Sequence, residues 1–274
     1  MQGIHVTALR EIKILRELHS PHVVELVDVF ITGGSNLALV LEYMESDLEA
    51  VIKDSSLVLS RADVKAYMRM ALQGLAACHA HNVIHRDIKP NNLLTATTGT
   101  PRAARVPLCV LARAGPSAQP CAAPMDASGL LVHSRSHGRA RAGHLKLADF
   151  GLSKVYGSPA GCRTAQVFAR WYRSPELLWG STSYGPAVDI WAMGCVFAEL
   201  VLRRPWLVAE SDIKQLSAIF AVLGTPQESG WKGMRDLPCF LPFTPCAGQP
   251  LEKLFPNVRA PCQTDRVCLA PCAR

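Results

Sequence analysis

The stretch His85-Arg86-Asp87-Ile88-Lys89-Pro90-Asn91-Asn92 holds a carboxylate, an ammonium group and a carboxamide at close, fixed spacing. Asp87 offers a carboxylate that can accept a proton, Lys89 brings a positive charge, and Asn92 brings an amide oxygen that can turn back toward a metal ion. Further along the chain, Asp149-Phe150-Gly151 adds a second carboxylate in a recognisable triplet. A pattern with several fixed positions and a downstream companion indicates a catalytic loop rather than a chance basic turn.

The order of these groups resembles the catalytic core of protein kinases. In that family, H-R-D-x-K-x-x-N is followed by D-F-G and then by a triplet of the A-P-E type, here Ser174-Pro175-Glu176. The resemblance implies that Asp87 is the base for a substrate hydroxyl and that Lys89 neutralises the moving phosphoryl group. It also implies that Asn92 and Asp149 hold Mg²⁺ at the phosphates of ATP.

Length and composition favour an ordinary globular chain. The 274 residues, 49% of them hydrophobic, suffice for one or two domains, and no apolar run is long enough to span a membrane. The segment after Met1 is charged and amphipathic, so we expect no signal peptide. The ten Cys contain no C-x-x-C pair, which favours reduced thiols in cytosol or nucleus.

The net charge of +7 is concentrated in one segment. Residues 99–142 contain six Arg and one Asp, and so carry +5 of that charge. A basic face of a folded domain would not gather its charge in one Pro/Ala/Arg segment, so we expect no direct nucleic-acid partner. The same segment has five prolines and no sustained hydrophobic period, and we expect 99–142 to be a disordered basic insert.

Hydrophobic spacing elsewhere predicts helices and strands in alternation. Helices are expected at 6–18, 61–81, 186–203 and 212–223, and strands at 23–30, 37–43 and 144–148. Ser60 and Ser211 are suitable N-caps, and Gly224 suits a helix end. We expect 258–274, which is rich in Cys, Pro and Arg, to be an unstructured tail.

Four segments narrow the resemblance to the cyclin-dependent kinases. Ala8–Lys13 resembles their cyclin-binding helix. Val51–Ser60 and Val64–Met68 are similar to the CDK-activating kinase subclass, the kinase of general transcription factor II H, and Gln166–Arg173 is similar to its plant and algal form. The match runs from about residue 3 to 98 and from 143 to 257. It implies an α+β, bilobal kinase fold, with a small lobe at 1–43 and a mainly helical large lobe at 44–98 and 143–257.

The resemblance also assigns a nucleotide site. Leu41 is implied as the gatekeeper, and Glu42, Tyr43 and Met44 as the hinge that binds adenine. Asp47 is implied to reach the ribose. Leu94 is implied as the floor of the adenine pocket, although Leu41 and Leu94 are also ordinary core leucines.

Regulatory and structural roles are implied by the same family. Thr164 would be a phosphosite, making the chain a phosphoprotein, with Arg10, Arg86 and Lys154 as candidate partners of the phosphate. Read without the family, Thr164 is an ordinary loop hydroxyl and Glu11 an ordinary surface charge. Asp189 is implied to brace the backbone of the catalytic loop. Glu176 would be a buried carboxylate that pairs with a distant Arg.

The sequence departs from the family pattern in three respects. It begins at the cyclin-binding helix, so we expect no Gly-rich loop, a small-lobe sheet of about two strands with an exposed edge, and no Lys partner for Glu11. Residues 99–142 interrupt the hairpin between Leu94 and Leu145, and a retained intron is our preferred hypothesis for them. The match ends near Asn257, which leaves Glu176 without its Arg and predicts marginal stability.

Two functions follow as expectations. The first is a cyclin-dependent serine/threonine kinase that uses ATP and Mg²⁺ on activation loops of other cyclin-dependent kinases or on the RNA polymerase II tail. It would act in cell cycle and transcription, in the nucleus and also in the cytoplasm, with a cyclin as partner and no membrane association. The alternative is an impaired kinase remnant that still binds a cyclin. An incomplete gene model of an active kinase reconciles the two.

Overall fold

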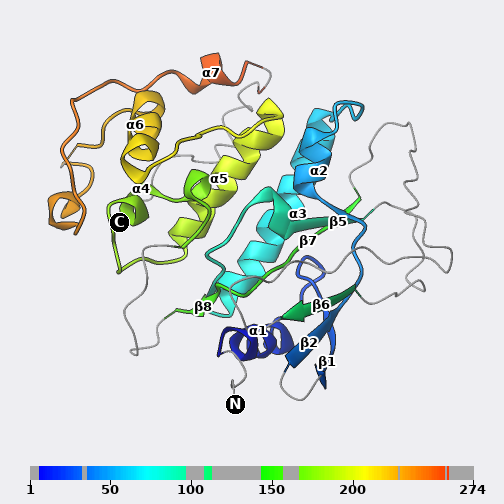
Figure 1. Cartoon of the computed structure of the whole chain (residues 1–274). Helices are drawn as coiled ribbons and strands as arrows, with labels where there is room; N and C mark the ends of the chain where they lie inside the picture. Colours follow the sequence, from blue (N-terminus) through cyan, green and yellow to red (C-terminus); the bar gives the residue numbers. More distant parts are fainter. Residues whose placement is uncertain are drawn as a thin grey trace. The chain divides into compact units, whose positions relative to one another are not determined.

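The computed structural model describes residues 6–32, 36–96, 108–112, 143–156, 167–227, 229–256 and 258 (Figure 1). Two compact units share the chain. The first is Met1–His85 with Pro90–Ser153, and the second is Arg86–Lys89 with Lys154–Arg274. The expected lobe boundary at residues 43 and 44 is therefore not where the compact units separate. Thr164 and almost all of the tail 258–274 lie outside the described residues.

The first unit opens with helix α1 (Val6–Glu17), one residue shorter than the expected helix. Its inward face is apolar, with Ile12, Ile14 and Leu15 at most 8% exposed, whereas Leu9 is 49% exposed on the other side. Strands β1 (Leu26–Thr32) and β2 (Asn36–Leu41) follow as an antiparallel pair. The expected strands are both present, each displaced by one to three residues.

A third strand completes this first sheet and corrects two expectations. Strand β6 (Leu108–Ala112) pairs antiparallel with β2, in the order β1-β2-β6 (Figure 1). The expectation of a sheet of about two strands is therefore wrong, because this sheet has three. The expectation that 99–142 is disordered is wrong at Leu108–Ala112, which forms β6. The physical reason lies in β2, whose five residues Leu37–Leu41 are all at most 8% exposed. A strand buried on both faces needs a neighbour along each edge.

The second sheet contains three short strands, in the order β3-β5-β7. They are β3 (Ser46–Asp47), β5 (Leu93–Ala96) and β7 (His144–Leu147). The helices beside them are α2 (Leu48–Lys53) and α3 (Arg61–Ala80), and the short elements β4 (Val83–Ile84) and η1 (Pro90–Asn92) lead into β5. Helix α3 begins with a capping box between Ser60 and Asp63, as the N-cap signal predicted.

Backbone contacts join this second sheet to the N-terminal segment. The Val24 amide donates to the Leu147 carbonyl at 2.9 Å, and the Leu147 amide donates to the His22 carbonyl at 2.9 Å. On α3, a Cβ at Gly74 would lie 2.4 Å from the His22 carbonyl oxygen, so only glycine permits this approach. These contacts explain why α3 and the hairpin β5–β7 belong to the same compact unit as α1.

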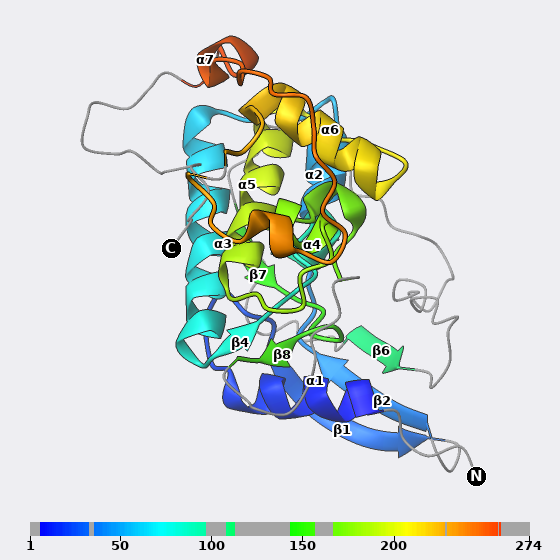
Figure 2. The ribbon, with the colours of Figure 1, turned by 90° about the vertical axis from the view of Figure 1, so that its left-hand side faces the viewer.

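The second unit is mainly helical (Figure 2). Its elements are β8 (Lys154–Val155), η2 (Arg170–Tyr172), α4 (Pro175–Leu178), α5 (Ala187–Leu202), α6 (Asp212–Leu223), η3 (Met234–Asp236) and α7 (Leu251–Leu254). Trp179 anchors the core at 1% exposure, with its ring 5.2–5.4 Å from the rings of Phe220, Trp231 and Phe240. Among the described helices, none has the length and apolar character that crossing a membrane requires.

Candidate active site

His85 supports the turn that carries Asp149. Its imidazole is fully buried, and Nε2 donates to the Ala148 carbonyl at 3.0 Å. The ring also packs edge-on against Phe150, with 4.9 Å between centroids. From the other side, the Ser153 hydroxyl donates to the His85 carbonyl at 3.1 Å. His85 and the D-F-G triplet are therefore held together by buried contacts within the first unit.

Asp149 stands in a left-handed backbone conformation with φ of 65°. Aspartate tolerates this region better than most residues do, because its short side chain can bond locally. Its Oδ1 accepts the Gly151 amide at 3.3 Å. Phe150 is fully buried next to it, whereas Asp149 is exposed. The turn thus anchors an apolar ring and presents a carboxylate.

Asn92 meets the same turn through the backbone. Its carbonyl accepts the Ala148 amide at 2.9 Å, and the residue is 6% exposed. An amide and a carboxylate are hard oxygen donors of the kind that Mg²⁺ accepts, and Mg²⁺ is commonly held by one or two protein oxygens together with substrate phosphates. Within the described part of the chain, no group of three or more His, Cys, Asp and Glu forms a self-sufficient metal cage. The donor set therefore fits a metal shared with phosphates.

Asp87 and Lys89 form an ion pair in the second unit. Lys89 Nζ lies 2.8 Å from Asp87 Oδ2, and the Asp87 side chain is only 8% exposed. Arg86, just before them, has φ of 68°, and its amide donates to Oδ1 of the fully buried Asp189 at 2.9 Å. This is the contact that the family resemblance implied for Asp189. The catalytic loop is thus fixed by a buried carboxylate from α5.

Glu11 on α1 lies in a setting that sequence reasoning did not foresee. Burial, and next the negative charge of Asp149, raise the pKa of Glu11 to about 7, although a hydrogen bond from the Phe150 backbone opposes this. The described residues thus place the negative charge of Asp149 near Glu11. The resemblance predicted a missing Lys partner but gave no sign of this proximity to Asp149.

The residues predicted to bind adenine and ribose come from the end of β2, the segment between β2 and β3, β3 itself and β5. Leu41 ends β2, and Leu41 and Met44 are each 8% exposed. Asp47 lies opposite Leu94 in the β3–β5 register, but its carboxylate also accepts the Ala50 amide at 2.8 Å as the N-cap of α2. These ligand roles remain predictions, and Asp47 has in addition a structural role that the resemblance did not indicate.

The predicted phosphate partners of Thr164 do not all belong to one unit. Arg10 is on α1 in the first unit. Arg86 and Lys154 are in the second, where the Arg86 guanidinium donates to the Tyr184 hydroxyl at 3.1 Å. Because Thr164 is outside the described residues, its phosphosite role stays a prediction. Glu176, which was expected to be buried, is half-buried, and its burial raises the pKa of the carboxyl group.

Sequence reasoning missed Arg173. Its guanidinium is largely buried and donates to the carbonyls of Val167 and Phe168 at 2.9 and 3.2 Å. It also lies 3.3 Å from Asp212 at the start of α6. These bonds fix the backbone at Val167 and Phe168. The only sequence signal was a basic residue within Arg170–Arg173, which does not identify the partner.

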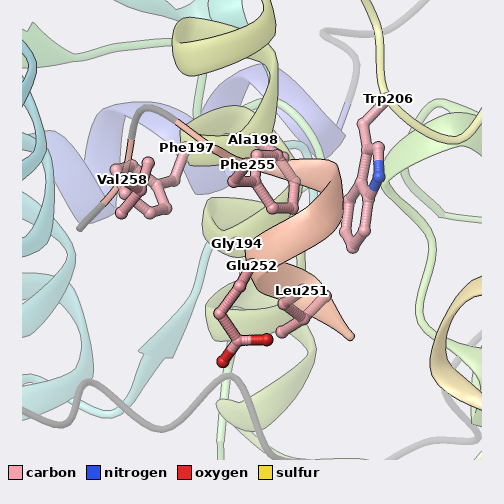
Figure 3. Close-up of a pocket in the computed structure, with 8 residues that line it drawn as sticks. All are labelled: Gly194, Phe197, Ala198, Trp206, Leu251, Glu252, Phe255 and Val258. Atoms are coloured by element: carbon pink, nitrogen blue, oxygen red, sulfur yellow. The ribbon is translucent and has the colours of Figure 1, made fainter. Parts of the chain in front are cut away.

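The second unit also has a small cavity with few polar groups in its lining. It encloses about 130 Å³ and is lined by residues of α5 and α7 and by Trp206, Phe255 and Val258 (Figure 3). Trp206 and Phe255 meet edge to face at 5.7 Å, and the Glu252 carboxylate points away from the Phe255 ring. Pockets for nucleotide-sized ligands usually enclose about 300–1,000 Å³ with several convergent polar groups, so this cavity is not the candidate active site.

Comparisons with known proteins identify the family of the chain. The protein kinase domain family matches residues 2–115 and 127–266. Cyclin-dependent kinase D-1 of Oryza sativa subsp. japonica is 47% identical over 255 residues, which are 93% of this chain and 50% of that protein. Cyclin-dependent kinase 7 of Xenopus laevis is 45% identical over 253 residues, 92% of this chain and 59% of that one.

Among solved structures, a chain of the CAK complex of Chaetomium thermophilum bound to ATP-gamma-S superposes with a TM-score of 0.72. It is 36% identical, and the match covers 93% of this chain and 68% of that one. The chain spans between 50% and 60% of the length of the cyclin-dependent kinases D-1 and 7 that it matches. It belongs to the protein kinase family and, within it, to the cyclin-dependent kinases of the CDK-activating subclass.

Proposed function

We propose that this chain is the catalytic part of a cyclin-dependent serine/threonine kinase that transfers the γ-phosphoryl group of ATP to protein hydroxyls. One observation carries the proposal. Asp87 and Lys89 form a 2.8 Å ion pair in a loop whose backbone is bonded to the buried Asp189. A carboxylate base beside a fixed ammonium group suits a reaction in which a hydroxyl loses its proton as negative charge moves between phosphate oxygens.

Each group would have a defined task. Asp87 would accept the proton as the substrate oxygen bonds to phosphorus, and the bond from phosphorus to the β–γ bridging oxygen would break to leave ADP. Lys89 would offset the charge on the transferring group. Asn92 and Asp149 are the residues that would hold Mg²⁺, which when bound supplies positive charge to the phosphate oxygens. Leu41, Glu42, Met44 and Leu94 would surround adenine, and Asp47 would face the ribose.

A cyclin is the proposed partner, with α1 and β1 as its docking surface. Leu9 on α1 and Val27 and Ile31 on β1 are 48–61% exposed although they are large and apolar. Related chains come from the CAK complex and from a yeast CTD kinase complex. These support activation loops of cyclin-dependent kinases and the RNA polymerase II tail as substrates, and a nuclear role.

The test is phosphoryl transfer by the purified chain with a cyclin, ATP and Mg²⁺, using a peptide from a cyclin-dependent kinase activation loop. Asp87→Asn should reduce transfer by about 10²–10⁴-fold, because it removes the base. Asp236→Asn, an exposed carboxylate of the same unit, is the matched control and should leave the rate unchanged. If the unaltered chain transfers no faster than Asp87→Asn, the proposed activity is wrong, and the alternative of a cyclin-binding module without transfer stands.

A further inference from the structure

Lys146 joins two segments of the first unit that are far apart in sequence. Its Nζ lies 2.5 Å from Oε1 of Glu42, at the start of the predicted hinge. Both side chains are largely covered, at 17% and 19% exposure. Water and salt weaken the attraction in a largely buried ion pair less than in a surface pair. The pair between Lys146 and Glu42 can therefore hold the segments around it in place more strongly.

Glu42 is fixed on its other side as well. The same Oε1 accepts the Glu25 amide at 2.8 Å, and the Glu42 amide donates to the Glu25 carbonyl at 3.0 Å. One carboxylate oxygen therefore bonds both the chain entering β1 and a lysine of β7. Removing the ammonium group would leave this carboxylate partly desolvated and without its cation, which favours movement of Glu42 toward water.

Lys146 also lies on the face of the hairpin that is not fully buried. Burial alternates along β5 and β7, so that Leu93, Leu145 and Leu147 are buried while Leu94 and Lys146 are half-buried. Leu94 and Lys146 are direct partners in the β5–β7 register. The lysine that fixes Glu42 is thus directly across the strands from the predicted floor of the adenine pocket.

We propose that Lys146 is a positioning residue for the purine part of the nucleotide. Through Glu42 it would fix the hinge backbone at a set distance from Leu94, and so hold the slot that adenine enters. This inference rests on the proposed function, because it refines the same nucleotide site. Its effect should be confined to the nucleoside, since the groups proposed for the phosphates are elsewhere, at Asn92 and Asp149.

The chain provides a matched control. Lys53 and Glu49 form a second Lys–Glu pair in the same unit, at 2.9 Å, but their side chains are 70% and 34% exposed and lie on α2. Lys146→Met and Lys53→Met each remove one ammonium group and keep a similar apolar stem. Lys146→Arg keeps the charge and should rescue binding. Glu42→Gln and the double variant test whether Lys146 acts through Glu42.

Calorimetric titration of the whole chain with adenosine, and separately with magnesium triphosphate, is the test. Lys146→Met should weaken adenosine binding roughly five- to ten-fold and triphosphate binding less than about two-fold. Lys53→Met should change neither. The double variant Lys146→Met with Glu42→Gln should bind adenosine no more weakly than whichever of the two single variants has the lower adenosine affinity. Equal adenosine affinity in Lys146→Met and the unaltered chain would overturn the proposal, even if the variant melts at a lower temperature.

Amide hydrogen exchange without ligand separates this inference from the proposed function. Lys146→Met should speed exchange at Glu42, Tyr43 and Met44, whereas Lys53→Met should not. If the unaltered chain binds no adenosine and no ATP, the proposed function fails, but faster exchange at the hinge would still support the positioning contact. Unchanged exchange there would overturn it.

Discussion

The two sheets of the first unit have the same number of strands but opposite patterns of burial. In the sheet β1-β2-β6, the central strand is buried on both faces along Leu37–Leu41. In the sheet β3-β5-β7, burial alternates, and Leu94 and Lys146 share the less covered face. A strand covered on both faces serves stability, whereas an alternating hairpin leaves one face for polar contacts and ligands. Leu94, the predicted floor of the adenine pocket, accordingly lies in the second sheet.

The largest effect expected near the second sheet is a loss of activity in a variant that still folds. Asp149→Asn should lower phosphoryl transfer about 10³-fold, because it removes the charge proposed to hold Mg²⁺ next to β7. Thermal unfolding should change little, since Asp149 is exposed. Asp236→Asn, an exposed carboxylate away from the proposed cyclin-docking surface, is the control and should preserve the rate. A rate for Asp149→Asn within about ten-fold of the unaltered chain would show that the metal role is wrong.

Glu11 tests whether α1 interacts electrostatically with Asp149 of the candidate site. Its pKa near 7 lies above the ordinary value of 4.5, so the folded state binds this proton more strongly than the unfolded chain does. Its contribution to stability is therefore complete below pH 4.5, is lost as the pH rises toward 7, and stays lost above that. The loss should be about 3 kcal/mol at most.

Urea unfolding at pH 5 and at pH 8 measures this effect. The stability of Glu11→Gln relative to the unaltered chain should increase from pH 5 to pH 8, because glutamine carries no charge that must be buried. Asp149→Asn should reduce that difference, since the Asp149 charge contributes to the raised pKa of Glu11. A difference that is independent of pH would contradict the raised pKa.

A smaller effect is expected from the insert strand at the first sheet. Replacing Leu108–Ala112 by a Gly-Ser segment should cost about 1–3 kcal/mol of unfolding free energy, because one edge of β2 loses its backbone partners. Amide exchange should speed up along Leu37–Leu41 while the catalytic loop is unaffected. The same replacement at Ala122–Asp126, in the same insert, is the control. Equal exchange rates in both variants would show that β6 does not protect β2.

Much of the fold could be predicted because its signals are local. The helix expected at 212–223 coincides with α6, and its Ser211 side chain accepts the Lys214 amide as the N-cap signal implied. The strand β6 could not be predicted, since its partner β2 is about seventy residues away and nothing in a Pro/Ala/Arg segment identifies that partner. The polar residues of the catalytic loop were found because their types and spacing follow from chemistry.

By itself, the sequence determined which chemical groups are present and in what order: Asp87, Lys89 and Asn92 in one loop, and Asp149 in a later triplet. Only the tertiary structure decided which distant groups meet. It brings Lys146 to Glu42, bonds His85 to Ala148 and sets the charge of Asp149 near Glu11. The reason is physical. Spacing along a chain encodes local geometry, whereas the partner of a buried charge depends on how sheets and helices pack.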